Sequence, residues 1–295
     1  MIGLIGGTGL GDALVGQSAA REVFPDTPFG KPSGPIRLAE WSGVQLAIVA
    51  RHGDGHMYNP SQVPYRANIY ALKSLGVTHI LASGACGSLR EEIAPRDLVV
   101  VDQVIDRTYR RTPTFFDEGL AVHVEFADPY CPQLRGRLLA AASKTNATVH
   151  PRGTYVCMEG PAFSTVAESR LHCAWGADLI GMTAMPEARL AREAEMCYAT
   201  VALATDYDCW RPHTPGVSRQ ALLEEILGHL KAATENAIAL LRATIATFAE
   251  RPADSCACHQ ALELGIWSDR SKVAPYVARR YGKLLEKYIA GVERA

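Results

Sequence analysis

The chain begins with MIGLIGGTGLG (residues 1–11), in which the apolar run Met1–Ile5 leads directly into a turn of closely spaced glycines. An uninterrupted apolar run is typical of a strand that is buried on both faces of a sheet. Glycines after such a strand let the backbone approach a bound anion, and Thr8 adds a hydroxyl donor. The spacing is not the GxGxxG of dinucleotide-binding folds, because the third glycine would have to stand at position 12, which is Asp12. The turn is therefore either an anion cradle or a plain tight connection.

The same pattern, a short apolar run followed by an amphipathic stretch, continues through most of the chain. This alternation predicts an α/β fold in which helices join parallel strands. The predicted strands are Met1–Ile5, Val44–Ala50, His79–Ser83, Leu98–Val104, Thr154–Met158, Leu179–Met182 and Cys197–Ala204. The predicted helices are Ala67–Leu75, Cys131–Lys144, Thr165–Trp175, Glu187–Ala194 and a long one from Ser218, its expected N-cap, to Phe248.

One break in composition, ERPADSCACH at residues 250–259, divides the chain. We expect one domain over residues 1–248 and an extension over residues 249–295 that contains a Cys-x-Cys motif and a terminal helix, Ser271–Val292. Cys256-Ala257-Cys258-His259 is open to three interpretations: a metal site, a disulfide or two free thiols. As a metal site the motif is two or more ligands short, so the sequence predicts no metal.

Composition excludes several classes of partner. The 295 residues include 30 basic and 31 acidic ones, for a net charge of -1, so no basic face for nucleic acid or an anionic membrane is expected. No apolar run is long enough for a membrane span, and the first residues lack the basic region of a signal peptide. The eight cysteines stand mostly singly in apolar segments, as reduced thiols do, which predicts a cytoplasmic protein.

Polar residues follow two further predicted strands. Arg51-His52-Gly53 comes after Val44–Ala50, and Ser83-Gly84-Ala85-Cys86-Gly87-Ser88 comes at the end of the next strand. Ligands of open α/β sheets bind at the carboxyl ends of strands, and an arginine beside a histidine suits phosphate or carboxylate. A surface arginine with a packed histidine, and a plain turn, remain the alternatives.

A pair of carboxylates closes the last predicted strand. Asp206 and Asp208 lie two positions apart, and they share one side if the segment stays extended. Like charges close together raise one pKa, so one carboxyl can serve as an acid near neutral pH; the alternative is a solvated acidic turn. Phe163 and Met182, each after an apolar strand, suit the walls of a flat apolar slot or simple core positions, and Thr183 suits a helix cap.

Taken in order, seven segments resemble the trimeric purine nucleoside phosphorylase family over essentially the whole of residues 1–210. They are GLIGGTGL, DTPFGKPS, ARHG, ACGSLREEIAPRDLVVVDQVIDRT, EGPAFST, MTAMPE and ATDYDCW. The resemblance implies a single-domain nucleoside phosphorylase-like mixed sheet flanked by helices. It also implies a homotrimer or a dimer of trimers, and a reaction that uses inorganic phosphate as co-substrate with no metal or organic cofactor.

Site residues follow from the resemblance by position. The phosphate-binding residues that it implies are Thr8, Arg51, His52, Ala85 through its amide, and Thr183. The substrate-binding residues that it implies are Phe163, Ile180, Met182, Asp206, Asp208, Leu222 and, from a neighbouring subunit, His123. Asp206 and Asp208 form the implied catalytic pair: phosphate stabilises the positive charge that builds on the ribose, while protonated Asp206 donates to the purine.

The resemblance further implies a substrate. An aspartate pair suits a 6-amino purine, and Leu222 with Leu223 suits a methylthio group. The expected reaction is phosphorolysis of S-methyl-5'-thioadenosine to adenine and 5-methylthioribose 1-phosphate; a broader purine nucleoside or methylthioinosine specificity is the alternative. Three positions depart from the family pattern. Gly84 lacks a hydroxyl that many relatives have, so one phosphate contact is either absent or supplied by Ser83, whereas Ala162 and Arg219 bear on substrate breadth. A nucleoside hydrolase and a nucleoside-sensing module remain as more distant alternatives.

Overall fold

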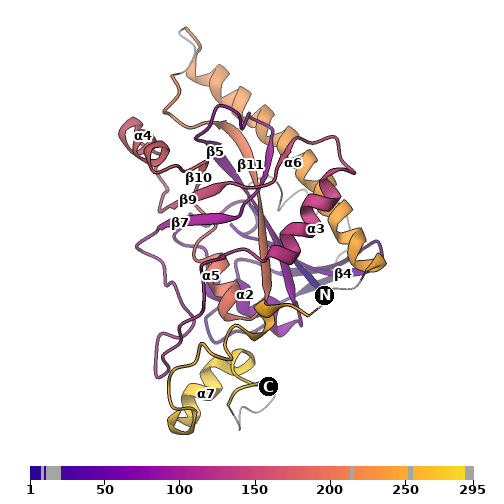
Figure 1. The fold of residues 1–295 in the computed structure, drawn as a ribbon, viewed down its shortest axis with the longest axis vertical. Coiled ribbons are helices and arrows are strands. Elements are labelled where there is room, and N and C mark those ends of the chain that lie inside the picture. The colour runs from indigo at the N-terminus through magenta and orange to yellow at the C-terminus, as the bar shows by residue number, and fades with distance from the viewer. Residues whose placement is uncertain (8–9, 11–20, 213–215, 252–254, 290–295) are drawn as a thin grey trace.

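The protein folds as a mixed sheet flanked by helices (Figure 1), seen in a computed structural model that describes residues 1–7, 10, 21–212, 216–251 and 255–289. The strands are β1 (Ile2–Gly6), β2 (Arg21–Val23), β3 (Ile36–Trp41), β4 (Val44–Ala50), β5 (His79–Ser88), β6 (Leu98–Val100), β7 (Gln103–Arg107), β8 (Val149–His150), β9 (Thr154–Met158), β10 (Leu179–Gly181) and β11 (Cys197–Tyr207). The helices are α2 (Tyr65–Ser74), α3 (Pro132–Ala142), α4 (Val166–Ala174), α5 (Glu187–Glu193), α6 (Arg219–Glu250) and α7 (Pro275–Tyr281), with 3-10 turns at Ala257–Gln260, Arg270–Lys272 and Gly282–Leu284.

The sheet runs in the order β2-β3-β4-β1-β5-β10-β9-β7, while β11 pairs with β5 and β6, and β6 pairs with β8. The strands β4, β1, β5 and β11 are parallel to their neighbours in this group, so their carboxyl ends lie at one edge. Their side chains alternate between two cores. Ile5 and Val49 belong to the core that includes α2 and α5, whereas Leu4 and Ile48 belong to the core that includes α3 and α6.

The predicted fold class is confirmed, and several element boundaries agree with the prediction. β4 and β9 have the predicted bounds, and Ser218 caps α6 by accepting a hydrogen bond from the backbone N–H of Ala221. The prediction of one strand over Leu98–Val104 is wrong. The chain leaves β11 after Val100, and from Gln103 it pairs with β9 instead, so two short strands replace the long one.

The prediction of a terminal helix over Ser271–Val292 is also wrong within the described residues, because α7 ends at Tyr281. Gly282 follows with a φ of 45°, a conformation that favours glycine. A side chain at this position would begin 2.7 Å from the hydroxyl of Tyr70. The extension packs on α2 here, and Lys287 Nζ lies 2.8 Å from the buried carboxylate of Glu195.

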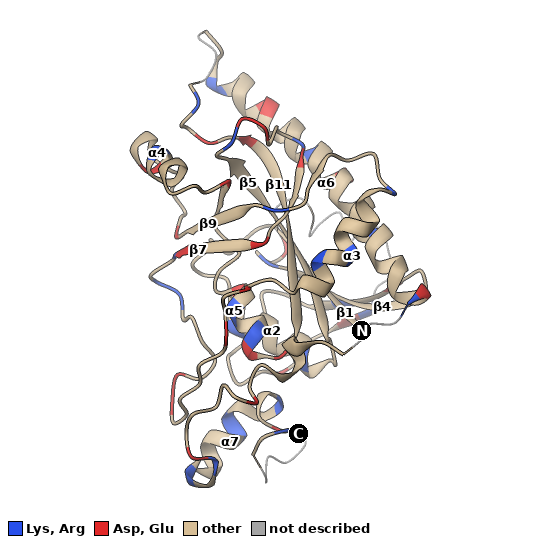
Figure 2. Cartoon of the chain, in the orientation of Figure 1, with Lys and Arg blue, Asp and Glu red and all other residues tan. Residues whose placement is uncertain are grey.

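Charged residues of both signs are interspersed over most elements of the fold (Figure 2), as the net charge of -1 leads one to expect. None of the helices in the described ranges has the length and apolarity that crossing a membrane requires.

Candidate active site

A buried arginine lies where β4 ends. Arg51 is 1 % exposed, and its Nε and Nη2 donate to the two carboxylate oxygens of Glu187 at 2.7 and 2.8 Å. Nη1 donates to the carbonyl oxygen of Ser83 at 2.7 Å, and Tyr198 donates its hydroxyl to Glu187 at 2.8 Å. Burial alone would lower the pKa of Arg51, but the charge and hydrogen bonds of Glu187 raise it above its ordinary value. Arg51 therefore carries a fixed positive charge.

Small residues open a space beside this guanidinium. A side chain on Gly7 would begin 2.8 Å from Arg51 Nη1 and 2.9 Å from the Ser83 carbonyl, so position 7 admits only glycine. A side chain on Gly84 would begin 3.2 Å from the hydroxyl of Thr183 and 3.9 Å from Arg51 Nη1. Gly7, Arg51 and Thr183, which follow β1, β4 and β10, thus meet beside Gly84 of β5, as an anion cradle requires.

Two predicted details of this cradle can be compared with the structure. Ala85, half-buried on β5, is next to Gly84, and Thr8 lies outside the described residues. The candidate hydroxyl of Ser83 is buried and has no hydrogen-bond partner among the described residues. Adjacent side chains of a strand point to opposite faces, so Ser83 and a side chain at Gly84 would point to different sides of β5.

His52 is held as a neutral ring beside Arg51. Its Nδ1 lies 2.8 Å from the carbonyl oxygen of Tyr58, which can only accept, so Nδ1 carries the hydrogen and Nε2 keeps a lone pair. Burial, followed by the positive charge of Arg51, lowers the pKa of His52 to about 4. The ring also stacks on His56, with 4.2 Å between the ring centroids.

The carboxylate pair lies at the end of β11. The strand continues beyond the predicted Ala204 to Tyr207, and an irregularity at Thr205 places Asp206 opposite Gly87 of β5. A side chain on Gly87 would begin 3.2 Å from both Asp208 Cβ and Ile180 Cγ2. The predicted residues Asp206, Asp208 and Ile180 are therefore brought together around Gly87.

Two polar atoms near this pair have no hydrogen-bond partner within the described ranges: Asp208 Oδ2 and His172 Nδ1, both buried. Burial lowers the pKa of His172, while the charge of Asp208 opposes that shift. An unpaired buried carboxylate oxygen costs stability unless something hydrogen-bonds to it. Asp208 is thus placed to receive a donor from a ligand.

A second buried ion pair, which the sequence did not indicate, joins the loops after β7 and β9, and its arginine also reaches the loop after β10. Arg111 donates to Glu159 at 3.2 Å and, through Nη1, to the carbonyl oxygens of Met182 and Met185 at 2.6 and 2.5 Å. Burial would raise the pKa of Glu159, but a hydrogen bond from Ser61, backbone N–H groups and Arg111 lower it to about 2. This pair fixes the backbone that carries Met182 and Thr183.

The remaining predicted residues lie at the periphery. Phe163 is 86 % exposed, and Leu222 is half-buried near the start of α6. His123 lies against the extension. Its backbone N–H donates to the Gly265 carbonyl oxygen at 2.8 Å, and the centroid of its ring is 4.6 Å from that of Trp267. The structure of the single chain does not bring Phe163 and His123 into the group around Gly84 and Gly87.

The mixed sheet, with a cationic cradle and a carboxylate pair along one edge, is the arrangement of a nucleoside phosphorylase. A model of the phosphorylase superfamily matches residues 1–246, and the chain belongs to that family.

Several proteins similar to this chain are methylthioadenosine phosphorylases. The chain is 46 % identical to the S-methyl-5'-thioadenosine phosphorylase of Synechocystis sp. over 97 % of its length and 87 % of that protein. It is 46 % identical to that of Thermosynechococcus vestitus over 98 % of its length and 99 % of that protein. A methylthioadenosine phosphorylase sourced from an antarctic soil metagenomic library superimposes with a TM-score of 0.88 at 42 % identity, covering 96 % of this chain and 98 % of that one.

The Arg51–Glu187 pair predicts a large loss of stability when the carboxylate is neutralised. Glu187→Gln leaves a buried guanidinium without its counter-charge, so the free energy of unfolding in urea should fall by about 3–5 kcal/mol. The control is Glu91→Gln, whose parent side chain is 73 % exposed and should change stability by less than about 0.5 kcal/mol. Equal stabilities of the two variants would contradict a charge-critical role for Glu187.

The low pKa of His52 predicts a defined pH dependence of stability. The unfolded chain protonates this ring near its ordinary value of 6.5, whereas the folded chain does so at about 4. The unfolded state therefore binds more protons between these values, and stability falls as the pH falls from 6.5 to 4. His52→Gln should remove this contribution. The unfolding free energy of the wild type minus that of the variant should therefore decrease as the pH is lowered from 6.5 to 4 in phosphate-free buffer. A difference that is independent of pH would show that folding does not perturb His52.

Proposed function

We propose that this chain catalyses the phosphorolysis of S-methyl-5'-thioadenosine to adenine and 5-methylthioribose 1-phosphate, with inorganic phosphate as co-substrate and no metal or organic cofactor in the reaction. One juxtaposition carries the proposal. Gly84 of β5 faces the cationic cradle, and Gly87 of the same strand faces the carboxylate pair. The two glycines are three residues apart, or about 10 Å along a strand, so the cradle and the carboxylate pair lie within the span of one nucleoside and its phosphate near the carboxyl end of β5.

Phosphate binding is supported by the donors that Arg51 has left. A guanidinium has five N–H groups, and one each on Nε, Nη1 and Nη2 is used by Glu187 and Ser83, which leaves two for an anion. In the proposed site the Thr183 hydroxyl, the Ala85 amide and Thr8 add further donors. Nε2 of neutral His52 accepts a hydrogen bond from a protonated phosphate oxygen.

The proposed chemistry uses this phosphate twice. Cleavage of the glycosidic bond builds positive charge on the ribose, and a phosphate dianion beneath the ring stabilises that charge. The same phosphate then attacks the anomeric carbon to form the sugar 1-phosphate. Because the cradle is fixed by buried ion pairs, it needs no rearrangement as charge develops.

The base is activated at the other end of the site. Thr205 Oγ1 lies 2.6 Å from Asp206 Oδ1 and 3.2 Å from the Cys86 carbonyl oxygen, and its single hydrogen serves only one of them. In the proposed reaction Asp206, oriented by the Thr205 hydroxyl, donates a proton to the departing purine. Asp208, with its unpaired Oδ2, accepts from the exocyclic amine.

Apolar residues complete the proposed pocket. Ile180 and Met182 flank the purine and ribose, and Leu222 at the start of α6 borders the 5' methylthio group. Phe163, which is exposed in the single chain, is the further flanking residue that the family resemblance implies. An apolar border leaves a 5' hydroxyl without a partner and so favours the methylthio substrate.

We further propose a homotrimer, or a dimer of trimers, in the cytoplasm. Val166 and Leu171 of α4, Trp175 after it and Phe163 before it are all more than 40 % exposed, and apolar patches of this kind mark interaction sites. His123 then reaches a neighbouring subunit's site. The reducing compartment is supported by the eight cysteines, which are all free.

Release of adenine is the direct test of the reaction. The chain should release adenine from S-methyl-5'-thioadenosine only when phosphate is present, and faster than it releases bases from adenosine, methylthioinosine or inosine at equal concentration. Preference for the inosine substrates would contradict the carboxylate argument and favour a methylthioinosine phosphorylase. Cleavage without phosphate would identify a hydrolase instead.

In the same assay Asp206→Asn should lower kcat by about a hundredfold or more, because the amide cannot donate an acidic proton. Asp128→Asn, at an exposed aspartate, is the matched control and should retain full activity. Full activity of Asp206→Asn would overturn the proposed role of this carboxyl.

The trimer predicts complementation between two impaired variants. Sedimentation equilibrium should give a molecular mass three times the 31.9 kDa of one chain, or six times for a dimer of trimers. His123→Ala and Asp206→Asn should each be impaired alone, whereas refolded mixtures should regain activity, because some sites then combine an intact Asp206 with a neighbour's His123. Mixtures no more active than their components would contradict a shared site.

A further inference from the structure

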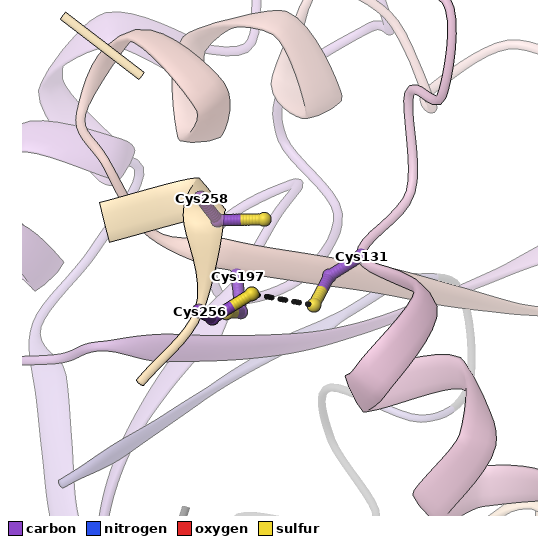
Figure 3. A group of neighbouring side chains, drawn as sticks. All are labelled: Cys131, Cys197, Cys256 and Cys258. Atoms are coloured by element: carbon purple, nitrogen blue, oxygen red, sulfur yellow. Dashed lines mark hydrogen bonds between the residues drawn. The ribbon is translucent and has the colours of Figure 1, made fainter. Parts of the chain in front are cut away.

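Four cysteines from distant parts of the chain meet at the amino end of β11, the opposite end of that strand from Asp206. They form a group that we call the four-cysteine cluster: Cys131, Cys197, Cys256 and Cys258 (Figure 3). Cys131 precedes α3, Cys197 begins β11, and the other two belong to the extension. The fold thus supplies the two ligands that the Cys-x-Cys motif lacked in the sequence.

The spacing of the sulfur atoms fits a tetrahedral metal ion. All four lie within 4.8 Å of one another, and the sulfurs of Cys131 and Cys256 are 3.6 Å apart. In a tetrahedral zinc thiolate the Zn–S bonds of about 2.3 Å place the sulfurs about 3.8 Å apart. The sulfurs already surround a space of the required size, and no side chain needs to be recruited from solvent.

The surroundings of the cluster favour thiolates. Each cysteine is at most 9 % exposed, and all are free thiols. The sulfur of Cys131 accepts a hydrogen bond from the backbone N–H of Leu134 at 3.4 Å, in the first turn of α3, where the helix dipole stabilises negative charge. Backbone N–H groups of this kind are the usual outer partners of metal-bound sulfur.

A nearby histidine belongs to the outer shell rather than to the ligand set. His259 Nε2 lies 3.5 Å from the sulfur of Cys197 and 3.4 Å from the carbonyl oxygen of Thr78. The carbonyl only accepts, so Nε2 carries a hydrogen and donates toward both atoms. In this tautomer Nε2 is not free to bind a metal. His79, Cys197 and His259 form a second group of possible ligands, but that group has three members and shares Cys197, so the four sulfurs are the set that completes a tetrahedral site.

We propose that the four-cysteine cluster binds one zinc ion as a closed structural site. Binding displaces one proton from each thiol, so four protons leave and the site has a net charge of −2, with no electron transfer. Thiolate sulfur selects zinc among the common divalent ions, and with four protein ligands no position remains for a substrate.

The zinc site would join the extension to the main domain. Cys131 and Cys197 belong to the main domain, while Cys256 and Cys258 immediately precede the segment that holds the loop of His123. In that segment the Gly265 carbonyl accepts from the His123 N–H, and the Trp267 N–H donates to the Ala121 carbonyl at 3.0 Å. Metal binding by the cluster does not depend on the proposed function; only its consequence for a neighbouring active site, through His123, does.

Metal analysis of the untagged chain, expressed with zinc and purified under reducing conditions without chelator, tests the proposal. We expect one zinc per chain by mass spectrometry of the metal, and a lower thermal midpoint after zinc is removed. Replacement by Co²⁺ should give the intense visible absorption of tetrahedral cobalt thiolate. A metal-free protein whose mass is four hydrogens lower would show two disulfides and overturn the proposal.

Variants identify the ligands independently of enzyme activity. Cys258→Ser should lower the zinc content from one equivalent to a small fraction, whereas Cys258→His, which restores a ligand, should recover it. Cys173→Ser is the matched control, because this half-buried cysteine lies outside the cluster and should leave one zinc per chain. Full zinc occupancy in Cys258→Ser would overturn the ligand set. If Cys258→Ser fails to fold, the metal content and cobalt spectrum of the unaltered chain still decide the question.

Discussion

The burial of one guanidinium constrains the whole ligand-binding edge of the sheet. Arg51 is fully removed from water, and a charge in that position is tolerated only with a counter-charge in good geometry. Glu187 provides it from the first turn of α5, so α5 and β4 cannot move independently. The guanidinium in turn excludes any side chain at position 7 and leaves room at Gly84. Gly7 after β1, the Ser83–Gly84 part of β5 and the start of α5 are all constrained by this ion pair.

The local sequence was sufficient to predict the bounds of an element where those bounds are set by residues within or next to the element. β4 and β9 are apolar runs with clear ends, and Ser218 is a capping residue before a long amphipathic stretch; their predicted positions were right. The run Leu98–Val104 has no local mark of its division, because the division is caused by a change of partner strand. The end of α7 depends on Tyr70, more than two hundred positions earlier in the chain.

The same distinction applies to the site. Asp206, Asp208 and Arg51 were predicted because each follows a recognisable strand, and the structure places them at one edge. Arg111 was missed because it lies outside every recognised segment and its partner Glu159 is 48 positions away, so only the fold joins the two. Pairing across such distances has no signature in a single sequence. A buried salt bridge of this kind can be found only once the strands that carry its two members are known to be neighbours.

The position of the four cysteines along the chain has a consequence for biosynthesis. Cys131 and Cys197 leave the ribosome with the strands and helices of the main domain, whereas Cys256 and Cys258 follow only after the 32 residues of α6. At about 5–20 residues per second the first two sulfurs wait several seconds for the others. The sulfurs of Cys131 and Cys197 are therefore made several seconds before the other two, and the proposed zinc site can close only after Cys258 has been synthesised.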